Sequence, residues 1–345
     1  MKRSHFLALC LILLLFPACA APVAAPEEYN PCQTDVLAMD TVMTLTVYDQ
    51  PAEKGFEILR KAAARIEELE GLLSVTSESS EIYRANHSGG ACVTLSDDSR
   101  RLLNDALDLC ASTGGALDVT VYPVVRAWGF TTQEYRVPEA AELEELLSRV
   151  DYRQIVLEDG GLTLPEGVEL DLGAVAKGYT GDQLMALFAA EGVTSAIVSL
   201  GGNVQTLGTR PDGSPWRVAL QAPEGGYAAV LEVTGKAVIT SGGYQRYFEQ
   251  DGETYIHIID PDTGRPAGTG LASVTIVADS GTLGDGLSTA LFVMGREGAE
   301  TYWRTRRDFD FVLLTEDGGA VVSEGLEDCF SLYGEWAGRP LEIVR

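Results

Sequence analysis

Apolar residues recur at helical spacing in several stretches of the chain. Between Lys54 and Leu73 they stand three or four positions apart, so a helix would gather on one side Phe56, Leu59, Ala63, Ile66, Leu69 and Leu73. The same spacing predicts further helices over residues 99–113, 139–150 and 178–191.

Short runs rich in β-branched residues accompany these helices and predict strands. The first is Val42–Tyr48, and Gly, Pro or Asp bounds the others, at residues 155–157, 162–164, 196–200, 216–220, 229–233, 237–240, 255–259, 273–277, 311–315 and 320–322. Many neighbouring runs have only turn-length connections, which favour antiparallel pairing. The order of elements predicts an α+β fold, with mainly antiparallel sheets flanked by helices, rather than a doubly wound parallel sheet.

The first residues have the pattern of an export signal. Lys2 and Arg3 precede an unbroken apolar stretch over residues 6–16, which Pro17 ends. This stretch is too short for a spanning helix, which needs about 20 apolar residues. We therefore expect the segment to be removed by cleavage.

The sequence FPAC at residues 16–19 resembles a lipobox, in which a cysteine is lipidated and becomes the new N-terminus. Cleavage without a lipid, near residues 20–25, is the alternative. We expect an extracytoplasmic lipoprotein anchored to the cell membrane through Cys19, with a signal peptide over 1–18, a tether over 19–35 and one domain over 36–345.

Acidic residues strongly outnumber basic ones. The chain has 51 Asp and Glu against 25 Lys and Arg, a net charge of −26, which becomes −28 once Lys2 and Arg3 are removed. Such a chain repels a polyanion, so we expect no nucleic-acid partner. A ligand that carries phosphate must be held by local groups or by a cation.

The cysteines do not indicate zinc. After Cys19 they stand at positions 32, 92, 110 and 329, without a C-x-x-C pair or a matching histidine spacing. Both disulfides and free thiols remain compatible with this pattern.

Two neighbouring segments contain the densest polar chemistry. Thr240–Tyr247 (TSGGYQRY) holds a glycine turn whose backbone amides could face a phosphate. His257–Pro266 (HIIDPDTGRP) begins with one of two histidines beyond the signal, and a histidine titrates near neutral pH. His257 is a candidate acid–base group, although it could also be a polar cross-strand residue beside an Asx-type turn.

Asp285 and Thr289 stand four positions apart at the start of an apolar run that ends at Met294. A helix would place both oxygen groups on one face. Such hard ligands suit Mg²⁺, which takes one or two protein carboxylates and leaves positions for water and phosphate. The alternative is an N-capping aspartate followed by a threonine in the first turn.

Two glycine corners complete the candidate chemistry. In Leu170–Tyr179 (LDLGAVAKGY) a strand end runs through a turn into a helix, with Asp171 and Lys177 on either side. This is not a nucleotide P-loop, because the lysine precedes the second glycine. Ser199–Asn203 (SLGGN) is another corner, where a ligand could approach the backbone closely.

Together these segments resemble the flavin transferase family known as ApbE over about Met39 to Gly295. Its motifs occur in order along the chain, and further ones are MDTVM at 39–43, SEI at 80–82 with Asn86, ALDVTVYP at 116–123, WGF at 128–130 and DGLSTALFVMG at 285–295. The resemblance implies an ApbE-like core, related to the T-fold, with an FAD cleft in which Mg²⁺ bridges to the diphosphate.

The resemblance also implies roles for single residues. Asp285 and Thr289 would be side-chain metal ligands, Ala174 would supply a backbone carbonyl, and His257 would activate the acceptor hydroxyl. Flavin or nucleotide contacts would fall on Met39, Ala116, Leu117, Asp118, Asp171, Lys177 and Ile259.

Three positions depart from the family pattern. Residues 73–76 (LSVT) lack an aromatic residue that often follows the Leu-Ser pair, so one wall of the flavin pocket would be less well stacked. Asp40 replaces the usual glycine beside Met39, and Gly243 replaces a common acidic residue. None belongs to the implied metal set, so we expect effects on ligand affinity rather than on reaction type.

The implied reaction is transfer of FMN from FAD to a Thr or Ser hydroxyl of an acceptor protein, with release of AMP. The implied acceptors are extracytoplasmic subunits of membrane redox complexes, such as Rnf-type or sodium-pumping quinone reductases, or secreted flavin-dependent reductases. Two alternatives remain: a Mg²⁺-dependent FAD pyrophosphatase, in which water replaces the hydroxyl, and a non-catalytic flavin-binding lipoprotein.

Overall fold

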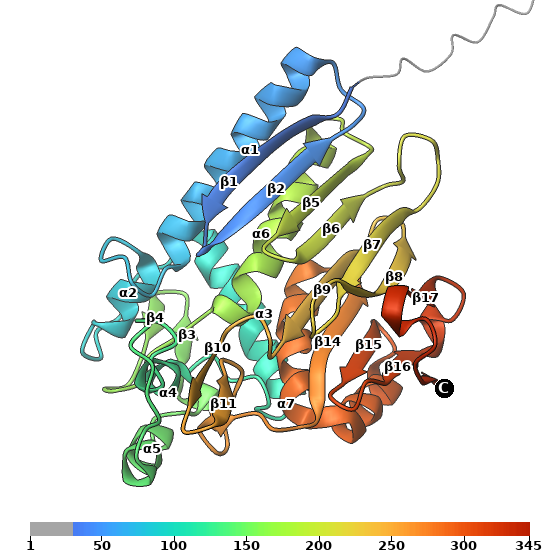
Figure 1. The fold of residues 1–345 in the computed structure, drawn as a ribbon. Helices are drawn as coiled ribbons and strands as arrows, with labels where there is room; N and C mark the ends of the chain where they lie inside the picture. The colour runs from blue at the N-terminus through green and yellow to red at the C-terminus, as the bar shows by residue number, and fades with distance from the viewer. Residues whose placement is uncertain (1–29) are drawn as a thin grey trace, which may run out of the picture.

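The computed structural model describes residues 30–345 and has a nine-stranded sheet at its centre. Neighbouring strands pair antiparallel, apart from β16 and β18, which are parallel. In spatial order the strands are β1 (Cys32–Ala38), β2 (Thr41–Val47), β5 (Ala196–Leu200), β6 (Asn203–Leu207), β9 (Ala237–Gly242), β14 (Leu271–Ala278), β15 (Asp310–Thr315), β16 (Ala320–Ser323) and β18 (Leu341–Val344) (Figure 1).

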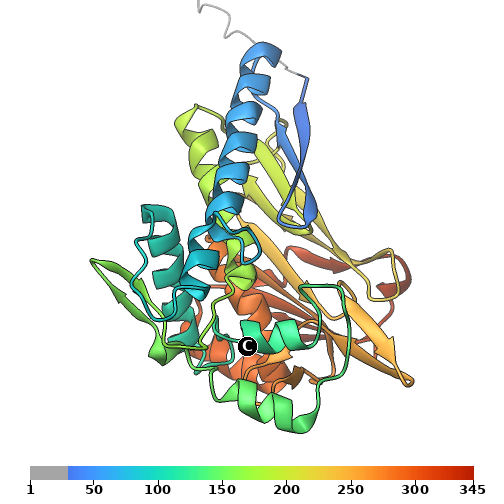
Figure 2. The same cartoon turned by 90° about the vertical axis from the view of Figure 1, so that its left-hand side faces the viewer.

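Long helices cover one face of this sheet. Figures 1 and 2 show α1 beside β1 and β2, and α7 behind β9 and β14. The long helices are α1 (Ala52–Leu73), α3 (Asp97–Ser112), α6 (Gly173–Ala190) and α7 (Gly281–Arg306), the last of which is interrupted at Gly295. This arrangement confirms the predicted α+β fold with mainly antiparallel strands.

A three-stranded sheet covers part of the opposite face. Its order is β17-β8-β7, from the strands β17 (Phe330–Leu332), β8 (Tyr227–Val233) and β7 (Trp216–Gln221). Successive side chains of β14 point to opposite faces of the central sheet. Val274 and Ile276 pack among the helices, whereas Val277 packs against the smaller sheet.

The remaining elements are short: α2 (Glu81–Asn86), α4 (Tyr122–Ala127), α5 (Ala140–Leu147), three turns of 3₁₀ helix (Tyr152–Gln154, Glu324–Leu326 and Gly334–Trp336), and the pairs β3 (Val156–Glu158) with β4 (Gly161–Thr163), β10 (Tyr247–Gln250) with β11 (Glu253–Ile256), and β12 (Ile259–Asp260) with β13 (Arg265–Pro266). Phe248 and Tyr255 stack with ring centroids 5.1 Å apart and join Trp128 in an aromatic cluster. This cluster supports the β10–β11 hairpin, which leads directly to His257.

Helices α6 and α7 approach closely because glycines line their contact. A Cβ atom on Gly178 would lie 2.1 Å from the carbonyl oxygen of Gly281. Gln205 Nε2 donates to the carbonyl of Gly178 at 2.9 Å. Asp182 of α6 accepts hydrogen bonds from the backbone N–H groups of Gly281 and Thr282, and so caps the start of α7.

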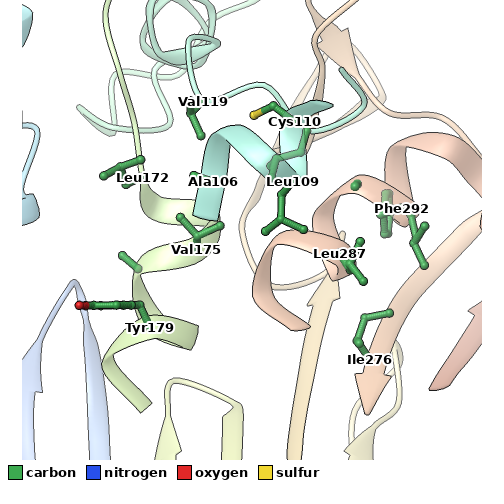
Figure 3. Close-up of a cluster of buried hydrophobic side chains, with 14 of the residues drawn as sticks. Ala106, Leu109, Cys110, Val119, Leu172, Val175, Tyr179, Ile276, Leu287 and Phe292 are labelled. Atoms are coloured by element: carbon green, nitrogen blue, oxygen red, sulfur yellow. The ribbon is translucent and has the colours of Figure 1, made fainter. Parts of the chain in front are cut away.

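A shared apolar core fixes these two helices against α3. Figure 3 shows Leu109 of α3, Val175 of α6 and Leu287 of α7 within one cluster of buried side chains. Gly286 permits the contact, since a Cβ atom there would lie 2.7 Å from Leu109 Cδ1. The backbone next to Asp285 is therefore held by packing.

Two expectations about the N-terminal part change. β1 begins at Cys32, so the folded domain starts before the predicted boundary at residue 36, and the predicted tether (19–35) is too long. The predicted signal peptide over residues 1–18 and the lipid site at Cys19 lie outside the described residues.

Phe56 was predicted on the buried face of α1, but its side chain is 49% exposed. Gly55 and Ile58 are buried instead. The reason is close packing by β1, because Cys32 Sγ lies only 2.6 Å from where a Cβ atom of Gly55 would stand. The buried face of α1 therefore includes Gly55 and Ile58 but not Phe56.

Several element boundaries also differ from the predictions. α6 begins at Gly173 rather than at residue 178, and α7 begins at Gly281, so Asp285 lies inside the helix and is not its N-cap. The N-cap is Ser280, whose side chain accepts from the N–H of Leu283. The predicted strand over residues 255–259 is broken by a bend at His257.

Cys32, Cys92, Cys110 and Cys329 are free thiols, so no disulfide links any part of residues 30–345. Among the helices of that same range, none has the length and apolar composition that a membrane span requires.

Candidate active site

A cleft of about 590 Å³ opens where the turns of the central sheet meet the starts of α6 and α7. Its walls come from the β1–β2 and β5–β6 turns, the end of β9, the segment around β11 and β12, and residues 116–131. All eleven residues singled out from the sequence line this cleft: Met39, Ala116, Leu117, Asp118, Asp171, Ala174, Lys177, His257, Ile259, Asp285 and Thr289. The structure therefore brings the complete predicted set together, from positions up to 250 residues apart in the numbering.

Asp285 is the most enclosed carboxylate of the cleft, with 4% of its surface exposed. Its Oδ2 accepts from the backbone N–H of Gly178 at 2.9 Å, and its Oδ1 accepts from Asn203 Nδ2 at 2.8 Å. Lys177 Nζ lies 3.9 Å from Oδ1. Burial raises the pKa of Asp285, and the charge of Lys177 acts in the opposite direction.

The side chain of Asp285 is directed toward the first turns of α6, where Ala174 stands. In an α-helix the N–H of Gly178 is the regular partner of the Ala174 carbonyl. Because this N–H donates to Asp285, the carboxylate and the carbonyl compete for one donor. The carbonyl oxygen of Ala174, a residue that lines the cleft, therefore keeps acceptor capacity.

Thr289 adds a hydroxyl one helical turn after Asp285, as the four-residue spacing predicts. Its Oγ1 lies 3.4 Å from Ser241 Oγ, which is also 2.7 Å from Ser288 Oγ. A carboxylate, a hydroxyl and a carbonyl are the oxygen donors that Mg²⁺ prefers. The residues present thus fit a hard divalent cation.

Residues 30–345 contain no group of three or more His, Cys, Asp or Glu side chains that could hold a metal ion by themselves. A cation between Asp285, Thr289 and Ala174 would therefore need water or ligand phosphate to complete its coordination. This donor set suits a cation that binds together with a phosphate-bearing ligand.

His257 follows β11 and is fixed by the backbone of Arg246. Its backbone N–H and its ring Nδ1 each lie 3.1 Å from the carbonyl oxygen of Arg246. Since a carbonyl only accepts, Nδ1 carries the proton, and Nε2 keeps a lone pair. Burial, with the charges of Arg246 and Lys177, lowers the pKa of His257 to about 3. The ring is therefore neutral near pH 7.

Asp118 lines the cleft, but its carboxylate is occupied by the protein. Oδ1 accepts from the backbone N–H and the hydroxyl of Thr120, at 2.8 and 2.6 Å, and Oδ2 accepts from the N–H of Tyr152 at 3.0 Å. Burial raises the pKa of Asp118, while these hydrogen bonds oppose the rise. Asp118 mainly shapes the wall of the cleft, and its bond to Tyr152 could not be predicted from the sequence.

Asp171 is placed by a clamp from α2. Asn86 accepts from the N–H of Leu170 at 2.7 Å and donates to the Leu170 carbonyl at 2.9 Å. The next residue, Asp171, accepts from the N–H of Gly173 at 2.8 Å. Removal of water raises the pKa of Asp171, and the charges of Arg246 and Lys177 oppose this rise. Asn86, known only as part of a motif, thus has a defined structural role.

Met39 and Asp40 form the two-residue turn between β1 and β2. Both have a positive φ, 50° and 58°, as a type I′ hairpin turn requires. Met39 donates its N–H to Glu70 Oε1 at 2.6 Å, which ties the turn to α1. The left-handed backbone at this position explains why the family usually has glycine where this chain has Asp40.

Several cleft residues were not singled out from the sequence. Among them are Phe130, Asn203, Ser241, Tyr244 and Arg246. These five lie inside motifs that the sequence displays, so motif membership was the available signal. By contrast, residues 73–76, where an aromatic wall was expected to be missing, do not line the cleft within the described chain.

Comparison with known proteins identifies relatives that match most of the chain. A model of the ApbE family matches residues 39–313. The FAD:protein FMN transferase of Salmonella typhimurium is 31% identical over 332 residues, which cover 92% of this chain and 95% of the relative. The protein of the same name from Treponema pallidum is 33% identical, with 88% and 89% covered.

Solved structures show the same likeness. A crystal structure of the ApbE protein from Thermotoga maritima has a TM-score of 0.81 and 30% identity, with 86% of this chain and 98% of that chain covered. The flavin transferase ApbE from Vibrio cholerae has a TM-score of 0.76 and 28% identity, with 89% and 98% covered. With the fold and most of the sequence in agreement, the chain belongs to the ApbE family.

Proposed function

We propose that this protein is an FAD:protein FMN transferase, which moves FMN from FAD onto a Thr or Ser hydroxyl of an acceptor protein and releases AMP. The relatives that match most of its length have this name. The observation that supports the proposal most is the meeting of Asp285, Thr289 and His257 in one cleft. These groups can serve a diphosphate and a hydroxyl nucleophile at the same time.

Asp285, Thr289 and the carbonyl of Ala174 would hold Mg²⁺ beside the diphosphate. Bound there, Mg²⁺ would neutralise part of the diphosphate charge and polarise the phosphorus. Lys177, 3.9 Å from Asp285 Oδ1, adds positive charge on the same side of the cleft. In a chain with a net charge of −26, these local charges are needed to hold an anionic ligand.

In the proposed reaction, His257 takes a proton from the acceptor hydroxyl. The hydroxyl oxygen forms a bond to the FMN-side phosphorus, the bond from that phosphorus to the bridging oxygen breaks, and AMP leaves with this oxygen. The proton passes to Nε2, which is the ring nitrogen not engaged by Arg246. The Arg246 carbonyl keeps Nδ1 protonated and fixes the ring.

The acceptors we propose are extracytoplasmic proteins with a Thr or Ser flavinylation site, such as Rnf-type or quinone reductase subunits. We also propose that a lipid on Cys19 anchors the protein to the membrane. Lys2, Arg3 and the apolar residues 6–16 support export. Labelled palmitate should enter the wild type but not a Cys19→Ala variant, and equal labelling of both would contradict the anchor.

Product analysis tests the transfer. The purified protein is incubated with FAD and Mg²⁺, with and without a purified acceptor domain, and AMP and protein-bound flavin are measured. A transferase forms AMP and covalent flavin in equal amounts, and only when the acceptor is present. Equal AMP formation without acceptor would identify a pyrophosphatase, and no AMP in either case would identify a flavin-binding protein.

A further inference from the structure

Arg246 is the one arginine among the residues that line the cleft. The other charged lining residues are Lys177 and the aspartates Asp40, Asp118, Asp171 and Asp285. Lys177 already faces Asp285. Within residues 30–345, no carboxylate lies within 4.0 Å of the Arg246 guanidinium, whereas most other arginines of the chain have such a partner.

The guanidinium of Arg246 is close enough to act on the reactive part of the site. Its charge lowers the pKa of both His257 and Asp171. Its backbone carbonyl holds His257, so the side chain extends from the same residue that orients the proposed base. Arg265 and several other exposed arginines of residues 30–345 also lack a carboxylate partner, but Arg246 is the one that lines the cleft, where its guanidinium is free to bind an anion.

We infer that Arg246 is a phosphate-binding residue, whose guanidinium holds non-bridging oxygens of the FAD diphosphate next to His257. This inference rests on the proposed function for the identity of the ligand. A planar guanidinium binds phosphate through two parallel N–H donors, which a lysine cannot reproduce. Arg246 and the Asp285 side of the cleft would then hold the diphosphate from two directions, and the phosphorus attacked would lie beside His257.

Flavins that carry two, one or no phosphate groups test this role. Binding of FAD, FMN and riboflavin is measured by flavin fluorescence for the wild type, Arg246→Gln and Arg246→Lys. We expect Arg246→Gln to weaken FAD binding about 10- to 100-fold, the usual effect of losing hydrogen bonds to a charged group. Riboflavin binding should not change, and Arg246→Lys should fall between the two.

Arg265→Gln is the matched control, because Arg265 is also exposed but does not line the cleft. It should bind FAD as the wild type does. The Arg246 side chain makes no hydrogen bond to residues 30–345, and its carbonyl is retained in every variant, so both variants should fold. The FAD affinity of the wild type should also fall as NaCl is added, and it should fall more steeply than that of Arg246→Gln.

A direct readout reports whether the guanidinium stands beside His257. Loss of the guanidinium in Arg246→Gln should raise the pKa of His257, which NMR of the imidazole ring can measure. A remote structural role of Arg246 would leave this pKa unchanged. The inference is overturned if Arg246→Gln binds FAD normally, or if FAD and riboflavin weaken equally. It is also overturned if only acceptor affinity falls, which would assign Arg246 to the acceptor. A wild type that binds FAD but transfers no FMN would refute the proposed function and not this role.

Discussion

Single side chains of the cleft are fixed by hydrogen bonds that leave one reactive atom available. His257 uses Nδ1 for the carbonyl of Arg246, which leaves Nε2 for chemistry. Asp285 uses both oxygens, for Gly178 and Asn203, yet each carboxylate oxygen has a second lone pair. The cleft is thus organised before a ligand binds, which lowers the cost of reaching the reactive arrangement.

The first prediction concerns the proposed base. His257→Ala should slow FMN transfer by about 10² to 10⁴, because a weak hydroxyl nucleophile loses its proton acceptor. FAD binding should change little, since the side chain is proposed to act on the hydroxyl. Single-turnover transfer rates and FAD titrations measure the two effects separately. A near-normal transfer rate in the variant would exclude His257 as the base.

The second prediction concerns the turn beside Met39. Asp40 has φ 58°, a conformation that glycine adopts without steric cost, so Asp40→Gly should raise the free energy of unfolding by up to about 1 kcal/mol. Asp40→Ala should lower it, since alanine lacks the aspartate's tolerance of this region. Urea unfolding of the three proteins checks the order. Equal stability of the Gly and Ala variants would show that the turn is unstrained.

Motifs singled out the candidate residues that the structure brings into one cleft, but they could not show which hydrogen bonds each side chain makes. Asp285, Thr289 and His257 stand out from the sequence because of their spacing and rarity. Asp118 stands in an equally good motif, yet Thr120 and Tyr152 occupy its carboxylate. Such bonds depend on side-chain directions that local patterns do not contain.

At the scale of elements, the contact between α6 and α7 places the proposed metal ligands. Gly178 lies at the closest point, and its N–H bonds directly to Asp285. Asp182 of α6 accepts from the start of α7, and Gln205 of β6 donates to the carbonyl of Gly178. The geometry of the site therefore depends on glycine at a helix position where glycine is otherwise unfavourable.

The third prediction tests this contact. Gly178→Ala should destabilise the protein by at least about 2 kcal/mol and weaken FAD binding, because the new methyl group would meet the Gly281 carbonyl at 2.1 Å and Asp285 Cβ at 2.7 Å. Gly71→Ala is the control in α1, where nothing lies within 4 Å. It should stabilise the protein by about 0.5–1 kcal/mol. Thermal unfolding would contradict the account if the two variants behaved alike.

Helices with strong periodicity were predictable, and glycine-rich starts were not. The predicted helix over Lys54–Leu73 differs from α1 by two residues at its start. α6 starts five residues before its predicted beginning, because two glycines in GAVAKG suggested a turn. Close packing against α7, which the sequence does not display, overrides the low helix propensity of those glycines.

Across the whole molecule, the acidic charge favours the proposed cation-assisted binding of a phosphate-bearing ligand. A net charge of −26 repels FAD unless positive groups converge at the cleft. Lys177 and Arg246 provide two such groups, and Asp285 offers a place for a divalent cation. These local charges would let an acidic protein hold the phosphate-bearing ligand that we propose.

The fourth prediction is a pH dependence of stability. The pKa of His257 is lowered to about 3 from an ordinary 6.5, so between these values the unfolded chain binds a proton that the folded protein does not. Stability therefore rises with pH in this window and is lost on acidification, by at most about 1.4 kcal/mol per pH unit. His257→Gln should lack this component. Urea unfolding at pH 4.5 and 7.5 measures it, and an identical pH response of both proteins would exclude it.

Tandem mass spectrometry of an acceptor protein after incubation with FAD and Mg²⁺ tests the central claim most directly. With the wild type we predict one FMN, attached through a phosphoester to a single Thr or Ser. With Asp285→Asn we predict an unmodified acceptor under the same conditions. An acceptor that stays unmodified with the wild type while FAD is converted to FMN and AMP, or one that Asp285→Asn labels equally fast, would contradict the claim.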